Sequence, residues 1–177
     1  MKRMTLLFAA IAISSIAAMA QGKTLVAYFS ATGNTQRVAK QVATITGGEL
    51  YEITPAEEYT SADLDWHDNK SRSSVEMNDK SARPAIIADL ENANSYDTIF
   101  IGYPIWWNEA PRIINTFIEK YSFAGKRVIP FATSGGSSIS NSATQLRRSY
   151  PDIDWGEALL LNRATNDDIK NWIKRQQ

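Results

Sequence analysis

The chain contains no cysteine and only one histidine among its 177 residues. Without cysteine the protein has no disulfide bond, and an export signal cannot end in a lipid-modified cysteine. A compact apolar core must therefore hold the fold together, and the chain is long enough to bury one. The single histidine, His67, lies between Asp65 and Asp68. One imidazole without further ligands is not a metal site, so we expect no metal centre.

An excess of charge of either sign is also absent. Nineteen Lys and Arg residues balance nineteen Asp and Glu residues, which gives no case for a nucleic-acid partner. No internal repeat is visible, so the length predicts one domain.

The first twenty residues have the pattern of a secretory signal. A basic start, MKR, precedes a mostly apolar run over residues 4–17 and a small-x-small site, AMA, at residues 18–20. The run is short for a membrane span and is interrupted by polar residues. We predict a signal at residues 1–20, export to the periplasm, and a mature domain at residues 23–177 with no membrane span. Its net charge would be about −2, because the signal holds two basic residues and no acidic one.

The stretch LVAYFSATGNT, residues 25–35, has the pattern of a buried strand, a hydroxyl-rich turn and a helix start. The first turn of a helix exposes unpaired N–H groups and the positive end of the helix dipole, which attract phosphate. Gly33 lets the backbone approach a ligand. Side-chain donors around the same point are Ser30, Thr32, Asn34 and Thr35. No Lys or Arg lies in this turn, so it is neither a Walker loop nor a GxGxxG dinucleotide turn. An ordinary capped turn is the alternative.

Strand and helix patterns alternate along the rest of the chain. Strands are expected near residues 25–29, 50–53, 98–101, 127–131 and 158–161, and helices near 35–46, 86–90, 111–118, 143–150 and, with Asn166 as cap, 166–173. This alternation predicts an α/β doubly wound parallel sheet, whose ligands bind beyond the carboxyl ends of the strands.

The polar segment 56–84 interrupts the alternation and is expected to be partly helical or functional. Its aromatic residues include Tyr59 and Trp66. We interpret them as side chains that pin the segment to the core, with cover for the edge of a ligand as the alternative.

Three loops fall at the carboxyl edge of the predicted sheet: Ser30–Thr35, Tyr103–Asn108 and Thr133–Ser138. In the second loop, Trp106 and Trp107 offer flat apolar surfaces on which a ring system can stack. Side chains alternate along an extended segment, so the two indoles are not expected to face the same way. In the third loop, glycines are expected to leave backbone amides free to donate to a ring edge, with an empty glycine-rich turn as the alternative.

The motifs FSATGNT, GYPIWWNEAP and FATSGGSS, in this order, resemble the three FMN-binding loops of flavodoxin-like proteins, in particular a bacterial subgroup with a WW second loop and a TSGGS third loop. The resemblance covers residues 23–177. It implies a flavodoxin-like five-stranded parallel sheet of order 2-1-3-4-5, helices on both faces, and FMN as cofactor.

The resemblance also implies a role for each loop. The phosphate would be held by Ser30, Ala31, Thr32, Gly33, Asn34 and Thr35. The ring would lie against a loop formed by Pro104, Ile105, Trp106, Trp107 and Asn108, with Trp106 as the stacking indole. The polar edge of the ring would face Thr133, Ser134, Gly135 and Gly136. No catalytic side chain is implied, because the flavin itself carries the redox chemistry.

One departure from the family pattern bears on function. Small electron-carrying flavodoxins usually cover the second ring face with an aromatic residue of the third loop and are strongly acidic, whereas this third loop has no aromatic residue and the charge is near neutral. We predict an FMN-dependent electron carrier that serves redox partner proteins. The alternative is an FMN-dependent oxidoreductase that uses a nicotinamide or quinone on an open ring face, and a third candidate is a flavin-free binding module. Export disfavours nicotinamide, which is chiefly cytoplasmic.

Overall fold

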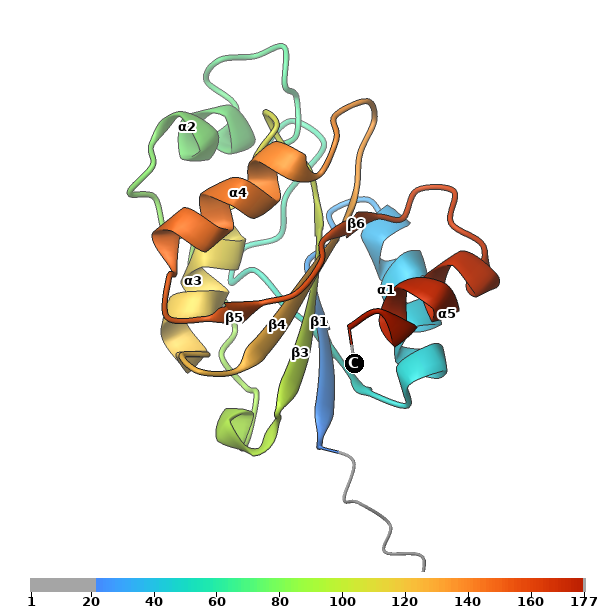
Figure 1. Cartoon of the computed structure of the whole chain (residues 1–177). Coiled ribbons are helices and arrows are strands. Elements are labelled where there is room, and N and C mark those ends of the chain that lie inside the picture. Colours follow the sequence, from blue (N-terminus) through green and yellow to red (C-terminus); the bar gives the residue numbers. More distant parts are fainter. Residues whose placement is uncertain (1–21, 177) are drawn as a thin grey trace, which may run out of the picture.

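Six parallel strands form the central layer of the part of the chain that the structure describes (Figure 1). The computed structural model describes residues 22–176, and the predicted signal at residues 1–20 lies outside them. In chain order the elements are β1 (Thr24–Tyr28), α1 (Asn34–Thr46), β2 (Glu49–Glu52), α2 (Arg72–Asn78), the 3-10 helix η1 (Ala93–Ser95), β3 (Thr98–Pro104), α3 (Arg112–Tyr121), β4 (Arg127–Thr133), α4 (Ser140–Ser149), β5 (Asp154–Trp155), β6 (Leu159–Leu160) and α5 (Asn166–Lys174).

The strand order is β2-β1-β3-β4-β5, with β6 paired to the far end of β4. All pairings are parallel. The predicted order and the doubly wound α/β class are confirmed. Because β1, β3 and β4 lie in the middle of the sheet, their carboxyl ends bring the three predicted loops to one edge.

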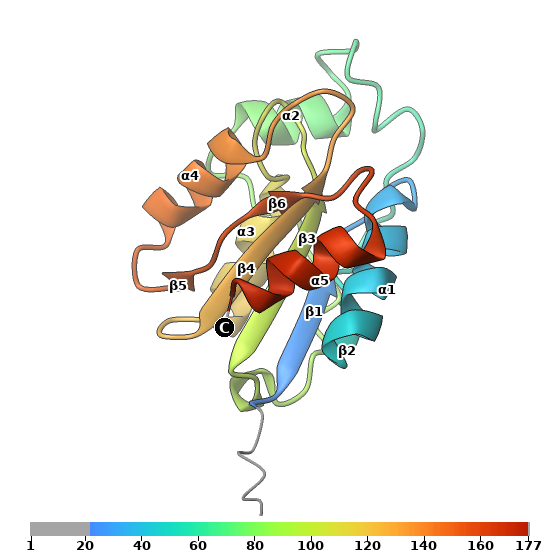
Figure 2. The same ribbon diagram turned by 45° about the vertical axis from the view of Figure 1, so that its right-hand side comes forward.

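Helices cover both faces of the sheet (Figure 2). Alternate residues of β1 enter opposite cores, as the period of a strand requires. Leu25 and Ala27 pack in the core beneath α3 and α4, while Val26 and Tyr28 pack in the core beneath α1 and α5. The apolar face of α3 is buried: Ile113, Ile114, Phe117 and Ile118.

The sheet leaves no room for a side chain at Gly102 in β3. A Cβ atom there would lie 2.3 Å from Cζ of Phe131, which is fully buried in β4. Glycine therefore lets the aromatic ring of Phe131 pack directly against the backbone of β3.

The helix predicted near residues 86–90 is wrong. Ile86 instead forms an isolated antiparallel bridge with Pro55, and the Ile87 N–H donates to the carbonyl of Thr54 at 2.9 Å. This segment is held extended by pairing with the residues that follow β2. The helix of this region is α2, which lies within segment 56–84 and shows that the segment is partly helical.

The fifth strand, predicted at residues 158–161, is split into β5 and β6, and the β5 portion was missed. The break falls at Gly156, where a Cβ atom would meet the side chain of Ile129 at 2.7 Å. The cap of the last helix also differs from the prediction. Thr165, not Asn166, is the N-cap, and its hydroxyl and Asp168 form a reciprocal capping box.

No helix within residues 22–176 has both the length and the apolar character that crossing a membrane requires.

Candidate functional site

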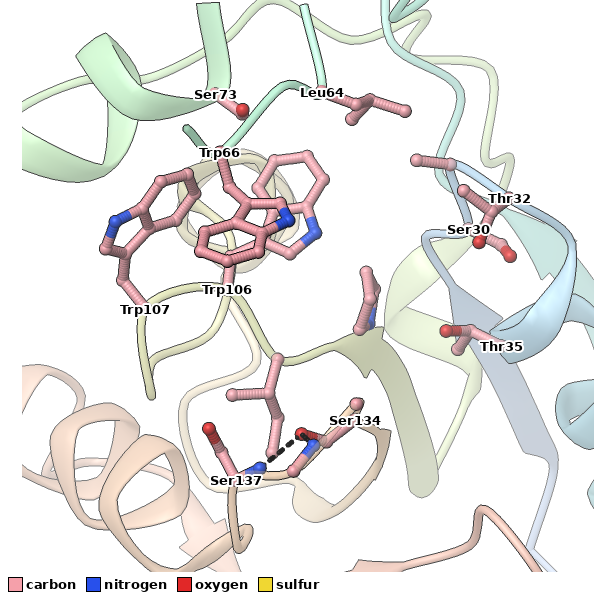
Figure 3. A pocket seen from close by; sticks show the side chains of 15 residues that line it. Ser30, Thr32, Thr35, Leu64, Trp66, Ser73, Trp106, Trp107, Ser134 and Ser137 are labelled. Carbon is pink, nitrogen blue, oxygen red and sulfur yellow. Dashed lines mark hydrogen bonds between the residues drawn. The ribbon is translucent and has the colours of Figure 1, made fainter. Parts of the chain in front are cut away.

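The three predicted loops surround a cavity of about 540 Å³ at the carboxyl edge of the sheet (Figure 3). Its lining includes eleven of the fifteen predicted site residues: Ser30, Ala31, Thr32, Thr35, Pro104, Ile105, Trp106, Trp107, Ser134, Gly135 and Gly136. The hydroxyl groups of the first loop lie on one side of this cavity and the indoles on the other. The cavity thus has a polar end and an aromatic end.

The first loop presents the open N-terminus of α1. Gly33 occupies the cap position in the left-handed conformation, with φ 82°, and no side chain caps the helix. The first turn carries no acidic residue, so nothing there competes with an anion for the helix dipole. The Asn34 amide donates to Oγ1 of Thr32 at 3.2 Å, which orients that hydroxyl while leaving its own proton available.

Two hydroxyl groups of this loop are buried. Oγ of Ser30 is buried and is the only such side-chain atom in the described residues without a hydrogen-bond partner. Thr35 lies 2.9 Å, Oγ1 to Oγ1, from Thr133 of the third loop. One hydroxyl of this pair donates to the other, so one proton remains for a ligand. Buried polar groups without a partner are costly, and the Ser30 hydroxyl therefore points to an absent partner.

The second loop is a tight two-residue turn. Trp106 and Glu109 exchange backbone hydrogen bonds of 3.0 and 2.9 Å across Trp107 and Asn108, both with positive φ (46° and 64°). This is the geometry of a type I′ turn. The segment is not extended, so the expectation that its two indoles diverge is wrong: both line the cavity.

The two tryptophans differ in how closely their side chains are packed against the rest of the protein. The Trp106 ring packs edge-on against the rings of Phe29 and Tyr59, with centroids 5.5 and 5.4 Å away. Trp107 is 45% exposed and has a left-handed backbone, which is strained for a bulky residue. Trp106 is the fixed wall and Trp107 the exposed one.

The third loop does not leave its amides free as predicted. The Ser134 N–H donates to Oδ1 of Asn162 at 2.7 Å, and the N–H groups of Gly136 and Ser137 donate to Oγ of Ser134 at 3.1 and 2.8 Å. Among residues 134–137, Gly135 is the position whose amide has no such bond. The Ser134 side chain folds back on its own loop and so withdraws donors that the sequence suggested were available.

Residues 23–176 match the sequence model of the flavodoxin family. The chain belongs to the flavodoxin family. The family predicted from the three loops is thereby confirmed, whereas the subgroup defined by the WW and TSGGS loops stays a prediction.

Solved structures similar to this flavodoxin-family chain fall into two groups. Candidate flavoproteins from Bacteroides eggerthii DSM 20697 and Bacteroides uniformis ATCC 8492 are 60% and 63% identical, with TM-scores of 0.85 and 0.84. The alignments cover 87% and 86% of this chain and 97% and 98% of those chains. A flavoprotein from Lactobacillus acidophilus NCFM, solved in complex with FMN, is 22% identical with a TM-score of 0.70 over 86% of this chain and 99% of that chain. At 22% identity, this similarity shows that the two proteins share a fold. No curated protein matches the chain.

The flavodoxin-family site has four further lining residues that the sequence reasoning did not assign to it: Leu64, Trp66, Ser73 and Ser137. Three of them belong to segment 56–84. The interpretation of its aromatic residues holds for Tyr59, which packs against Phe29 and Trp106, but is wrong for Trp66, which is 66% exposed. The sequence signal that could have placed Trp66 at the site is the occurrence of a tryptophan in a polar segment.

A second cavity of about 400 Å³ adjoins the first at its polar end. It is lined by two further predicted residues, Asn34 and Thr133, and by three unpredicted ones, Arg37, Asn162 and Arg163. The remaining two predicted residues line neither cavity. Gly33 shapes the helix start, and the Asn108 carbonyl accepts a hydrogen bond of 2.9 Å from Asn141, which ties the second loop to α4.

Charge is distributed unevenly around this flavodoxin-family site. The fifteen residues that line the first cavity carry no ionisable side chain, while the two arginines lie in the adjoining one. Behind the aromatic wall, burial and a 2.5 Å hydrogen bond to Glu76 raise the pKa of Tyr59, which stays a neutral donor. In residues 22–176 no three His, Asp or Glu side chains gather closely enough to bind a metal ion.

Proposed function

We propose that this protein binds FMN non-covalently and carries electrons between redox partners. The observation that carries the proposal is the buried Ser30 hydroxyl, which lacks a protein partner and lies beside the uncapped N-terminus of α1. An orphaned donor next to a helix N-terminus is what a phosphate monoester would satisfy.

The residues present fit the cofactor at both ends. The phosphate would be held by the first-turn amides of α1 and the hydroxyls of Ser30, Thr32 and Thr35. The ring would lie in the part of the cavity walled by Trp106 and Trp107, whose volume suits a group of this size. The FMN complex of the Lactobacillus acidophilus flavoprotein, which shares the fold, supports the same ligand.

FMN, when bound, supplies one- and two-electron redox chemistry. The protein's own groups position it and shape its surroundings. A lining without ionisable side chains holds the ring in an apolar setting, which disfavours added negative charge there. The phosphate is bound by dipoles and hydroxyls, with Arg37 and Arg163 of the adjoining cavity as the nearby positive charges.

An FMN-dependent oxidoreductase with a nicotinamide or quinone substrate is the second candidate. It is favoured by the exposed Gly135 and Gly136, which leave the third-loop side of the cavity without an aromatic cover. Slow turnover of NAD(P)H and quinones, together with two separable one-electron potentials, would support the carrier. Rapid turnover of either substrate would support the enzyme.

We also propose that the protein is exported to the periplasm, on the basis of the signal-like residues 1–20. Cell fractionation with and without these residues tests this proposal. Retention of the full-length chain in the cytoplasm would contradict it.

Binding of FMN and riboflavin to the apoprotein tests the cofactor assignment. Riboflavin lacks only the phosphate, so it should bind at least about 100-fold more weakly, which corresponds to about two hydrogen bonds to a charged group. Thr32→Ala should weaken FMN binding and leave riboflavin binding unchanged. Equal affinity for both flavins would exclude the first loop as a phosphate site, and a colourless protein that ignores FMN would favour the flavin-free module.

A further inference from the structure

Trp66 is a large aromatic side chain that the protein leaves without a burial site. Its residue surface is 66% exposed, although tryptophan is among the side chains that gain most from burial. Within the described residues its aromatic contact is with the exposed neighbour His67, at 3.5 Å between ring centroids and 34° between ring planes. Even so, it lines the same cavity as Trp106 and Trp107 (Figure 3).

The loop that carries Trp66 is held in a defined shape. Thr60 and Asp63 exchange side-chain to backbone hydrogen bonds of 2.9 and 3.2 Å, and the Asp65 carboxylate accepts from the His67 N–H at 3.0 Å. The Ser73 N–H closes the loop by donating to the Asp63 carbonyl at 2.9 Å. Turns of this kind fix the backbone on both sides of Trp66.

The same loop is fastened to the second loop of the site. Tyr59 packs against Trp106, and the Arg72 guanidinium lies 4.0 Å from the centre of the Tyr59 ring. At the other end of α2, buried Arg112 donates to the Met77 carbonyl at 2.9 Å and to the Glu109 carboxylate at 2.8 Å. The positions of Trp66 and of the second-loop tryptophans are therefore set by one connected framework.

We infer that Trp66 contacts the flavin ring and covers a face that the second-loop tryptophans leave open. This inference rests on the proposed FMN site. The third loop has no aromatic residue that could take this part, and the cavity reaches from the second-loop indoles to Trp66. An indole already held at the cavity costs little entropy to place against a bound ring.

A covered ring face bears on the choice between the two candidate functions. Hydride transfer requires a donor to stack on the ring, and Trp66 would occupy that place. Electron transfer to a protein partner requires only proximity. The position of Trp66 therefore favours the carrier over the oxidoreductase.

The test compares Trp66→Ala, Trp66→Phe and a control, Val75→Ala, in the purified protein. Val75 is an exposed residue of α2, in the same segment, and does not line the cavity. Three quantities are measured: the dissociation constants of FMN and riboflavin, the quenching of bound-flavin fluorescence by iodide, and the apoprotein melting temperature.

Trp66→Ala should weaken FMN binding about tenfold, the scale of one lost aromatic stacking contact. The affinity for riboflavin should fall by the same factor, because Trp66 contacts the ring and not the phosphate. Iodide should reach the flavin more readily, and the melting temperature should stay unchanged. Trp66→Phe should retain affinity to within about threefold, since a smaller ring still stacks, and Val75→Ala should match the wild type.

Wild-type affinity and iodide access in Trp66→Ala would overturn the inference about Trp66 and leave the FMN proposal standing. A loss confined to FMN, with riboflavin unaffected, would also overturn it, because the effect would then lie at the phosphate. A wild-type protein that binds neither flavin would overturn both proposals.

Discussion

Ser30 carries a hydroxyl group that the fold buries and leaves without a protein partner. Such a group loses its hydrogen bonds to water when the chain folds and regains none, which costs free energy. Its neighbour Thr35 is also buried but is paired with Thr133. The two hydroxyls of one loop therefore differ. Removing the Thr35 hydroxyl would leave the Thr133 hydroxyl without its hydrogen-bond partner, whereas removing the Ser30 hydroxyl leaves no protein group without one.

We predict that Ser30→Ala separates stability from binding. The free energy of unfolding of the apoprotein should stay the same or rise by about 1 kcal/mol, because an unsatisfied buried hydroxyl is removed. FMN affinity should fall about tenfold or more, the cost of one hydrogen bond to a charged acceptor. Urea denaturation and flavin titration measure the two quantities. A destabilised apoprotein with unchanged FMN affinity would mean that the hydroxyl serves the fold.

At the scale of elements, the third loop is shaped by a residue that lies beyond β6. Asn162 accepts from the Ser134 N–H at 2.7 Å, and its amide group donates to the Ser134 carbonyl. One exposed side chain thus pairs with both backbone groups of Ser134, in the manner of a neighbouring strand. The loop that faces the cavity is held by this clamp and by the Ser134 hydroxyl.

We predict that Asn162→Ala weakens flavin binding without a direct contact to the ring. The loop would lose about 1 kcal/mol of support for each hydrogen bond, so FMN affinity should fall by about threefold to tenfold. Asn94→Ala is the matched control, because Asn94 is an exposed asparagine of η1 before the amino end of β3. Flavin titration checks both variants, and equal affinities would show that the clamp is dispensable.

At the scale of the whole molecule, several carboxyl groups have lowered pKa values and several tyrosines have raised ones, and Glu119 and Tyr103 are one example of each. Hydrogen bonds from the Arg83 guanidinium lower the pKa of Glu119 below its ordinary value of 4.5, and the Tyr150 hydroxyl adds a further bond. Burial raises the pKa of Tyr103 from 10.0 to about 12, against a smaller opposing effect of its bond to Ser142. Glu119 affects stability at acid pH, and Tyr103 affects stability at alkaline pH.

We predict a plateau of stability with a loss at each end. A depressed carboxyl pKa stabilises the fold above about pH 4.5, and this contribution is lost as the pH falls through the folded-state pKa. A raised tyrosine pKa stabilises the fold below about pH 10, and this contribution is lost as the pH rises toward 12. Unfolding by urea across pH tests both limits. Glu119→Gln should make the loss in acid less steep, and Tyr103→Phe should do the same for the loss in alkali. An unchanged alkaline limb in Tyr103→Phe would assign it to other groups.

The sequence by itself determined which segments form the central strands and the helices that follow them, and where the three loops that line the cavity lie. Period-two and helical patterns in β1, β3, β4, α1 and α3 are local properties of the chain, and parallel strands bring the loops that follow them to one edge. Eleven predicted residues accordingly line one cavity.

Only the tertiary structure decided which groups face that cavity and which are already engaged. The bond of the Ser134 N–H to Asn162 and the return of Trp66 to the site depend on contacts between distant segments. The same holds for the extended segment at Ile86. Hydrogen bonds and packing partners far apart in the chain leave no local periodicity, so a pattern read along the sequence cannot contain them.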